Sequence, residues 1–238
     1  VTHINLGAQG TGSDALTASD LRAIHEACPN AELDYRFTLY GHEINLNDSA
    51  LDFRGTEISD EAAALNEVLP LMLRCSYLDM DNTGVSNEAL AKIREEFPNI
   101  DVVWRVWFGT NYSVRTDVER ILASKPTVGG MIYDVSVLQY CTKVKYLDIG
   151  HNDELPSIDF ARSMPELEVL IIAMTAVTDI SPLESCPKLE YLEINSTNIS
   201  DISPLKNSTG LHHLNIACCP EITDISPLYG LTELERLW

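Results

Sequence analysis

Apolar residues recur at fixed positions in the C-terminal part of the chain. In the segment that begins at Leu189, the first, fourth and sixth positions are Leu189, Leu192 and Ile194. Alternation of the last two predicts a short β-strand with both side chains turned inward. A Ser-Pro pair follows at 203–204. Serine is a good N-cap and proline fits the first turn of a helix, so the pair predicts a short helical turn on the return path.

This segment is one of several near-copies. Regular copies begin at Leu167, Leu189 and Leu211, a further start follows at Leu234, and the steps between them are 22, 22 and 23 residues. A less regular copy begins at Val144. Because one copy cannot bury its own apolar edge, the copies must stack strand beside strand. The sequence therefore predicts a parallel sheet with strands about 4.8 Å apart.

Longer copies precede the regular ones. A helix-plus-strand pattern occurs twice, in residues 16–41 and 85–109. In the first of these, Leu21 and Ile24 share one helical face, which predicts an amphipathic helix. The second continues into DVVWRVWF at 101–108, where bulky side chains alternate on both faces. We expect this segment to be a strand that is covered on both sides.

Stacking also predicts which side chains reach solvent. The third and fifth positions of each copy flank the inward residues of the strand, so they point to the open face of the sheet. The eighth position lies beside that face. Reading these positions along the copies selects the candidate binding residues Tyr77, Tyr146, Asp148, Val169, Ile171, Met174, Tyr191, Glu193 and His213.

The copy that begins at Leu167 is unusual, because Val169, Ile171 and Met174 place apolar side chains where solvent is expected. An apolar patch flanked by tyrosines and rimmed by carboxylates has the composition of an interface centre with a polar rim. The alternative is that the tyrosines stack on one another across strands and stabilise the sheet without a ligand. The variant Ile171→Asp tests whether this residue belongs to the core, because the substitution would lower the melting temperature only if the side chain is buried.

Composition narrows the function classes. The chain has 238 residues, of which 45% are hydrophobic, and this fits a folded rather than a disordered protein. Sixteen basic and 36 acidic residues give a net charge of −20. Such a surface repels phosphate backbones and anionic lipids, so we expect neither nucleic-acid binding nor membrane adsorption. No apolar run approaches the roughly 18 residues that a membrane span needs, so we expect no membrane insertion within this chain.

The chain offers little chemistry for catalysis or metal binding. Six cysteines without a CxxC pair indicate neither a disulfide framework nor a zinc ribbon. His213 and Cys218 would lie roughly 16 Å apart on one strand, too far to share a zinc ion, and Cys219 should point inward. No glycine-rich phosphate loop, G-x-S-x-G or H-E-x-x-H sequence occurs. We therefore expect no cofactor, no metal and no enzyme activity.

A column of aspartates precedes the return-path turns. Its members are Asp134, Asp179, Asp201 and Asp224. Calcium needs several oxygens that converge on one point, whereas this column supplies one carboxylate per strand spacing. We expect each carboxylate to accept backbone N–H hydrogen bonds at its own turn.

The pattern LxxLxIxxTxIxDISPL resembles the leucine-rich-repeat family. It is similar to the 22-residue, DISPL-type subclass of bacterial internalin-type surface proteins and of eukaryotic phosphatase-regulating repeat proteins. The match is strong over residues 131–238 and weaker over 48–101. The family's asparagine at the ninth position is mostly threonine here, as at Thr175 and Thr197. Threonine can also bond the turning backbone, though more weakly.

The resemblance implies an α/β fold, a leucine-rich-repeat solenoid with a parallel concave sheet. We expect irregular repeats and an N-terminal cap region in residues 1–130, with helices on the convex side. Residues 131–238 should form regular repeats with short 3-10 or turn segments, in one continuous solenoid with the first part. The last residues, LERLW at 234–238, begin a further repeat, so we expect that the natural protein continues or that this edge meets another molecule.

The resemblance also implies non-catalytic recognition of a macromolecule, in the first place a protein, through the concave face. The acidic field favours a basic partner and predicts salt-sensitive association rates. The internalin likeness implies a bacterial protein that is extracellular or on the cell surface. The phosphatase-regulating likeness implies, as an alternative, a cytoplasmic regulatory scaffold that docks an enzyme. Carbohydrate binding, which suits tyrosines beside carboxylates, and a purely structural module are further alternatives.

Overall fold

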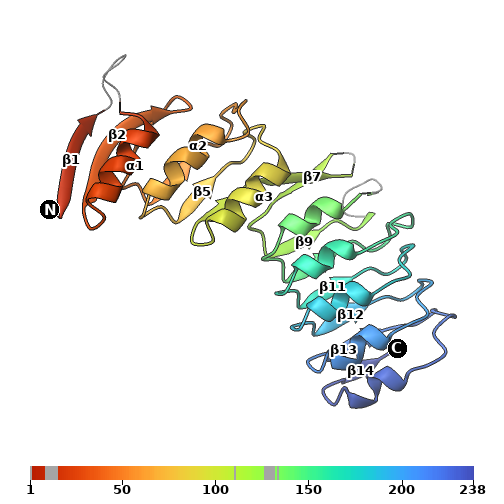
Figure 1. The fold of residues 1–238 in the computed structure, drawn as a ribbon. Coiled ribbons are helices and arrows are strands. Elements are labelled where there is room, and N and C mark those ends of the chain that lie inside the picture. Colours follow the sequence, from red (N-terminus) through yellow and green to blue (C-terminus); the bar gives the residue numbers. More distant parts are fainter. Residues whose placement is uncertain (1, 9–15, 110, 126–131, 133) are drawn as a thin grey trace. The chain divides into compact units, whose positions relative to one another are not determined.

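The computed structural model describes residues 2–8, 16–109, 111–125, 132 and 134–238. The chain divides into two compact units, Val1–Trp104 and Arg105–Trp238, and Figure 1 labels several elements of each. The predicted domain boundary at residue 130 lies outside the described residues. A single solenoid that runs through both units stays a prediction.

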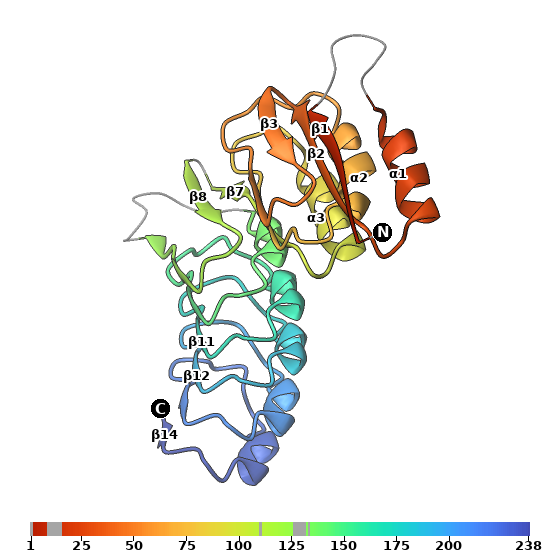
Figure 2. The same ribbon diagram turned by 90° about the vertical axis from the view of Figure 1, so that its left-hand side faces the viewer.

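The first unit consists of helices and two three-stranded sheets, β1-β2-β3 and β4-β5-β6. Strand β3 is antiparallel to β2, and the other pairs are parallel. The helices lie side by side along one face of the unit (Figure 2). In chain order its elements are β1 (His3–Ala8), α1 (Ala18–Ala27), β2 (Glu32–Leu39), β3 (His42–Asn45), β4 (Ala50–Asp52), α2 (Ala63–Val68), the 3-10 helix η2 (Leu69–Leu71), β5 (Tyr77–Asp79), α3 (Asn87–Glu96) and β6 (Asp101–Val103).

The two predicted helices of this unit are confirmed, and each begins at a capping side chain. Thr17 and Asp20 form a capping box before α1, in which Thr17 Oγ1 accepts a hydrogen bond from Asp20 N at 3.2 Å and Asp20 Oδ2 accepts one from Thr17 N at 2.8 Å. Ser86 caps α3 with a single side-chain bond, since its Oγ accepts from Ala89 N at 3.3 Å. Leu21 on α1 is buried, as the predicted apolar face requires.

The second unit contains the hairpin β7–β8 and a six-stranded parallel sheet in which β9 to β14 follow one another in chain order. Its 3-10 helices line the side opposite the strands (Figure 2). Its elements are β7 (Arg105–Phe108), β8 (Tyr112–Arg115), β9 (Arg120–Leu122), η3 (Ser136–Tyr140), β10 (Tyr146–Asp148), η4 (Asp159–Ser163), β11 (Val169–Ile171), η5 (Ser181–Ser185), β12 (Tyr191–Glu193), η6 (Ser203–Asn207), β13 (His213–Asn215), η7 (Ser226–Gly230) and β14 (Arg236–Leu237).

The short helical turns at the Ser-Pro pairs are confirmed, but the capping group is not the serine. Ser203 is the first residue of η6, and the position before it, Ile202, makes no side-chain cap. Asp201 supplies the acceptor instead: its Oδ1 accepts from Ser203 N at 2.7 Å and its Oδ2 from Ser203 Oγ at 3.0 Å. The carboxylate reaches the first N–H because it stands two residues earlier. Equivalent bonds to the backbone N–H of the serine two residues on form at Asp134, Asp179 and Asp224, so the predicted role of the aspartate column is confirmed.

The predicted strand 101–108 is wrong in two respects. It is divided at Trp104, so that β6 belongs to the first unit and β7 to the second. Strand β7 pairs with β8 in a two-stranded sheet, and such a hairpin packs one face inward. Val106 and Phe108 are buried on that face, whereas Trp107 on the other face is 60% exposed.

Candidate functional site

The six-stranded sheet of the second unit presents two rows of outward side chains, which together we call the outer sheet face. Strand register places the first residue of each strand in one row and the third in the other. The first row is Arg120, Tyr146, Val169, Tyr191, His213 and Arg236, and the second is Leu122, Asp148, Ile171, Glu193 and Asn215. Seven of the nine predicted site residues therefore share this face, and Met174 follows β11 beside it.

Aromatic rings occupy much of the first row. The Tyr191 and His213 rings stack with centroids 5.5 Å apart, and the His213 and Trp238 rings stack at 6.4 Å. The stack buries Nδ1 of His213 without a hydrogen-bond partner among the residues that the structure describes. At the other end of the row, the Arg120 guanidinium carbon lies 3.9 Å from the centre of the Tyr146 ring. Among the residues that the structure describes, cross-strand stacking thus covers the Tyr191 ring on the side of β13.

In two of the five strands, β10 and β13, the second row has a structural function. Asp148 Oδ1 accepts from Gly150 N at 3.1 Å, and Asn215 Oδ1 accepts from Ala217 N at 3.1 Å. Each side chain thereby closes the turn that follows its own strand. Ile171 occupies the same position in β11 and has no atom that could accept this bond.

Tyr191 and Glu193 form a pair on one strand. The Tyr191 hydroxyl donates a hydrogen bond to Glu193 Oε1. This bond raises the pKa of Tyr191 to about 12, and burial and the charges of Glu193 and Tyr146 add to the rise. Ionisation of the phenol would remove the donor and place a second negative charge beside the carboxylate.

The apolar centre of the face is accessible. Val169 and Ile171 are half-buried, with hydrophilic neighbours in the same rows. Met174 is 47% exposed and adopts a left-handed backbone conformation with φ of 56°. A left-handed backbone is costly for a side chain of this size, and nearly half of the surface of Met174 remains open to solvent.

Tyr77 is not part of this surface, because β5 belongs to the first unit. Its hydroxyl donates to Asp79 Oδ2 at 3.1 Å, and Arg54 Nε lies 3.8 Å from the same oxygen. Arg54 also pairs with Asp52. The phenol of Tyr77 is therefore engaged in a local network within the first unit.

The ninth position of each repeat points inward, as predicted. Thr175 Oγ1 donates to Ile172 O at 2.8 Å and Thr197 Oγ1 donates to Ile194 O at 2.7 Å. Cys219 takes this position in the next repeat, where its thiol is buried and donates to Ile194 O at 3.1 Å. It is a core residue.

The cysteines and the acidic groups do not assemble a metal centre in the part of the chain that the structure describes, because no three His, Cys, Asp or Glu side chains come together there. All six cysteines are free thiols. Burial raises the pKa of Cys186 to about 11, which makes its thiolate scarce at neutral pH. None of the described helices has the length and apolar character that a membrane span needs.

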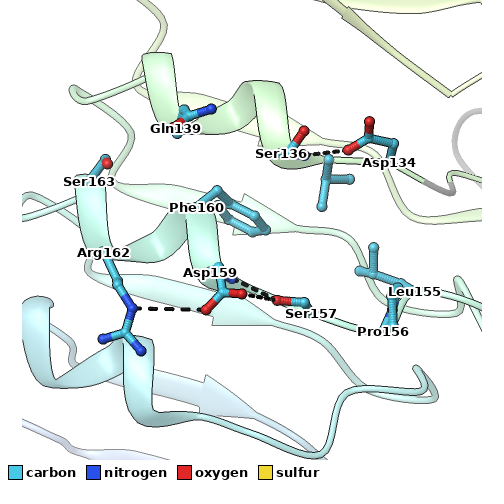
Figure 3. A pocket seen from close by; sticks show the side chains of 11 residues that line it. Asp134, Ser136, Gln139, Leu155, Pro156, Ser157, Asp159, Phe160, Arg162 and Ser163 are labelled. Carbon is cyan, nitrogen blue, oxygen red and sulfur yellow. Dashed lines mark hydrogen bonds and ion pairs between the residues drawn. The ribbon is translucent and has the colours of Figure 1, made fainter.

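The structure also shows a hollow of about 440 Å³ between η3 and η4 that the sequence reasoning missed (Figure 3). Its floor is the buried ring of Phe160. Here Ser157 and Asp159 exchange the places that aspartate and serine hold in the regular repeats, and Asp159 N donates to Ser157 Oγ at 3.0 Å. The Arg162 side chain reaches the next 3-10 helix, η5, where its Nη2 donates to Ser181 Oγ at 2.9 Å. In the sequence, this repeat departs from the Asp-x-Ser-Pro pattern of the regular repeats at Ser157–Phe160, and that departure could have pointed to the hollow.

Comparison with known proteins bears on the fold. A family model described as Leucine Rich repeats (2 copies) matches residues 165–207. A search of curated protein sequences finds no match. Among solved structures, the chain is similar to the internalin InlF of Listeria monocytogenes, with 18% identity, a TM-score of 0.44 and coverage of 92% of this chain and 54% of that one. It is also similar to internalin C2 of the same species, with 17% identity, a TM-score of 0.39 and coverage of 95% and 85%.

A leucine-rich-repeat protein of Leptospira interrogans is similar at 13% identity with a TM-score of 0.41, over 81% of this chain and 43% of that one. Because 54% of InlF is covered, this chain spans about half the length of that internalin. The family match and the regular alternation of strand and 3-10 helix confirm the predicted leucine-rich-repeat fold.

Proposed function

We propose that this chain is a non-catalytic recognition module that binds a protein partner through the outer sheet face of its second unit. The observation that carries the proposal is the half-exposed apolar residue Ile171 at a row position where Asp148 and Asn215, in β10 and β13, supply an acceptor that closes the following turn. A hydrogen bond of this kind contributes about 1 kcal/mol to stability. Replacing the acceptor by a half-exposed apolar side chain gives up that contribution without burying the side chain in the core.

The surroundings of Ile171 support the same conclusion. Val169 precedes it in the first row, and the exposed Met174 follows it. Together they form an apolar centre between Asp148 and Glu193, which lie beside Ile171 in the neighbouring strands. Apolar centres with polar rims are typical of protein interfaces.

The charge of the chain supports a basic partner. A net charge of −20 produces a long-range attraction for positive surfaces and repels acidic ones. The association rate with such a partner should fall steeply as salt is added, because surface charges are screened beyond about 8 Å at physiological ionic strength. An association rate that is indifferent to salt would contradict this part of the proposal.

Carbohydrate is the less favoured ligand. Sugars stack on open faces of aromatic rings, and here one face of Tyr191 is covered by His213 and one face of Tyr146 by Arg120. The His213 ring lies between Tyr191 and Trp238 and has both faces occupied. The faces of Tyr146 and Tyr191 that stay open belong to two separate rings, so the row does not form the broad, flat aromatic platform that carbohydrate binding would use.

The test is affinity capture from source-cell and host extracts with three forms of the chain. These are the wild type, the double variant Ile171→Asp/Tyr191→Ala, and a control variant Asn207→Ala at an exposed position of η6. We expect a protein that the wild type and the control retain and the double variant loses, provided that all three melt as folded chains. Equal capture by all three would contradict recognition through the outer sheet face.

The location outside the cell stays a prediction, and it rests on the resemblance of the repeats to those of internalin-type surface proteins. We infer a bacterial, extracellular or cell-surface protein. Protease treatment of intact source cells tests it, since a surface protein is cleaved while a cytoplasmic marker protein survives. Protection of the chain until the cells are lysed would favour the cytoplasmic scaffold instead.

A further inference from the structure

Two tyrosines on the outer sheet face stand on either side of an apolar floor. Tyr146 and Tyr191 flank Val169 in the first row, one strand away on each side. Two strand spacings place them about 10 Å apart. The Tyr146 face toward β9 is covered by Arg120, and the Tyr191 face toward β13 is covered by His213. The opposite faces of both rings are therefore turned toward each other above Val169, and we call this space the tyrosine slot.

Two carboxylates lie beside the tyrosine slot in the second row. Asp148 and Glu193 flank Ile171 as the tyrosines flank Val169. One oxygen of each is engaged within the protein, since Asp148 Oδ1 accepts from Gly150 N and Glu193 Oε1 accepts from the Tyr191 hydroxyl. The second oxygen of each carboxylate provides an acceptor at the rim of the slot.

We propose that the tyrosine slot receives an arginine side chain of the partner protein, stacked between Tyr146 and Tyr191 and bonded by Asp148 and Glu193. This inference rests on the proposed function and names the group that the outer sheet face recognises. A planar group midway between the rings lies about 5 Å from each, within the roughly 6 Å over which a cation is attracted to a ring centre. Val169 and Ile171 contact the aliphatic stem.

Arginine fits this geometry better than a compact ammonium group does. Its guanidinium is flat, stacks on aromatic rings and presents donors in a fork that matches a carboxylate. The chain itself provides an example of such stacking. On the face of the Tyr146 ring that is turned away from the tyrosine slot, the Arg120 guanidinium carbon lies 3.9 Å from the ring centre.

The positive charges in the row do not prevent binding. By strand spacing, the backbones of Arg120 and Arg236 lie about 10 and 14 Å from the slot centre. The Arg236 charge reaches far enough to lower the pKa of Tyr191, but this is the last of the influences on that phenol, after the larger effect of Glu193. Screening weakens interactions over such distances. Asp148 and Glu193 are only one strand away, so the attractive charges dominate.

The slot can be tested without the partner, by nuclear magnetic resonance titration of the whole chain with small probes. Acetyl-arginine-amide carries the proposed group, and acetyl-citrulline-amide has nearly the same shape without the charge. With the arginine probe we expect saturable shifts of the Val169 and Ile171 methyl signals and of the Tyr146 and Tyr191 ring signals. The affinity of the citrulline probe should be lower by about tenfold or more, because this probe lacks the cation–π and charged hydrogen-bond contributions.

Two variants complete the test. Asp148→Asn/Glu193→Gln keeps both internal acceptors, as Asn215 demonstrates for its own turn, but removes the charges and should weaken the arginine probe about tenfold. Val169→Tyr introduces the residue of the neighbouring strands and should fill the slot and abolish the shifts. Equal shifts with both probes, shifts that survive Val169→Tyr, or no saturable shift at all would overturn the proposal. Partner capture that is lost on Ile171→Asp/Tyr191→Ala would still support recognition by this face, so the two failures are distinguishable.

Discussion

Asp148 and Ile171 are partners in the parallel ladder between β10 and β11, yet only Asp148 secures the turn that follows its strand. Its Oδ1 accepts from Gly150 N at 3.1 Å, and the aliphatic side chain of Ile171 has no acceptor. The two residues occupy the same repeat position. The turn hydrogen bond that Asp148 makes and Ile171 lacks is therefore the stabilising contact that β11 loses by presenting an apolar side chain.

Ile171→Asp should therefore leave the melting temperature nearly unchanged, because repulsion from Asp148 and Glu193 in the neighbouring strands offsets the turn bond that the variant gains. The new carboxylate can make the turn bond that Asp148 makes, and the lost side chain is only half-buried. The matched control is Leu170→Ala, which removes a fully buried side chain from the same strand and should cost about 2–5 kcal/mol. Thermal unfolding followed by circular dichroism measures both, and a comparable loss in the two variants would show that Ile171 is a core residue.

The aspartate column should make the free energy of unfolding fall at acidic pH. Bonds from the backbone N–H and hydroxyl of Ser203 hold the pKa of Asp201 below its usual 3.8, and the equivalent bonds from Ser226 lower the pKa of Asp224. A lowered folded-state pKa adds stability above about pH 4 that is lost as pH falls through the folded value. Asp201→Asn/Asp224→Asn should be less stable than the wild type at neutral pH, with the difference vanishing toward pH 2. The control Glu221→Gln removes one exposed carboxylate outside the turns, and a similar profile for that variant would contradict the assignment.

Periodicity predicted the regular repeats well, because their apolar positions satisfy local and stacking requirements together. The inward strand residues, the 3-10 turns and the inward ninth position all follow from spacing. The bonds of the aspartate column were also predicted, but the role of the serine was not: Ser203 was expected to cap its turn, whereas it donates both its N–H and its hydroxyl to Asp201, two residues earlier. The break at Trp104 also escaped prediction, since a strand that leaves one sheet for a hairpin keeps its alternation.

The candidate site was predicted as a row of outward positions, and the register places seven of its members on one sheet. The sequence could not show that Tyr77 belongs to a separate unit, because that depends on where the chain divides. Nor could it show which ring faces are covered. That Arg120 covers Tyr146 and His213 covers Tyr191 depends on side-chain rotamers, which the spacing of residues does not specify.

The pair Tyr191–Glu193 should make stability depend on alkaline pH. The pKa of Tyr191 is raised to about 12 by its bond to Glu193, so this phenol stabilises the fold fully below its ordinary value of 10. The contribution is lost as pH rises from 10 through 12, because the unfolded phenol ionises first. Comparing wild type with Tyr191→Phe by denaturant unfolding should therefore give a difference that shrinks above pH 10. A difference independent of pH would mean that the hydrogen bond does not stabilise the neutral phenol.

The cysteines should differ sharply in reactivity. Cys218 is exposed, whereas Cys186 is buried and its pKa is raised to about 11. Because the thiolate is the reactive form, iodoacetamide at pH 8 should label Cys218 in the native chain and Cys186 only after unfolding. Mass spectrometry of the peptides gives both rates. Labelling of native Cys186 as fast as that of Cys218 would show that the repeat opens locally.

Asn152 is the residue of the ninth position that satisfies the most backbone groups. Its Nδ2 lies 2.8 Å from Ile149 O, 3.1 Å from Ala123 O and 3.3 Å from Gly150 O. Its Oδ1 accepts from Ile132 N at 3.2 Å. The side chain is fully buried, so no water can replace these bonds without a change in packing.

Asn152→Ala should therefore be the most destabilising single polar substitution of the ninth position, with a loss of roughly 3 kcal/mol or more as several buried groups lose their partner. Asn152→Thr should recover part of the loss, because threonine can bond the carbonyl three residues earlier, as Thr175 does at 2.8 Å. Thr175→Val removes one such bond and should cost about 1–2 kcal/mol. Urea unfolding of the three variants should rank them in that order of increasing stability. A loss at Asn152→Ala no larger than that at Thr175→Val would show that the additional contacts of Asn152 are not stabilising.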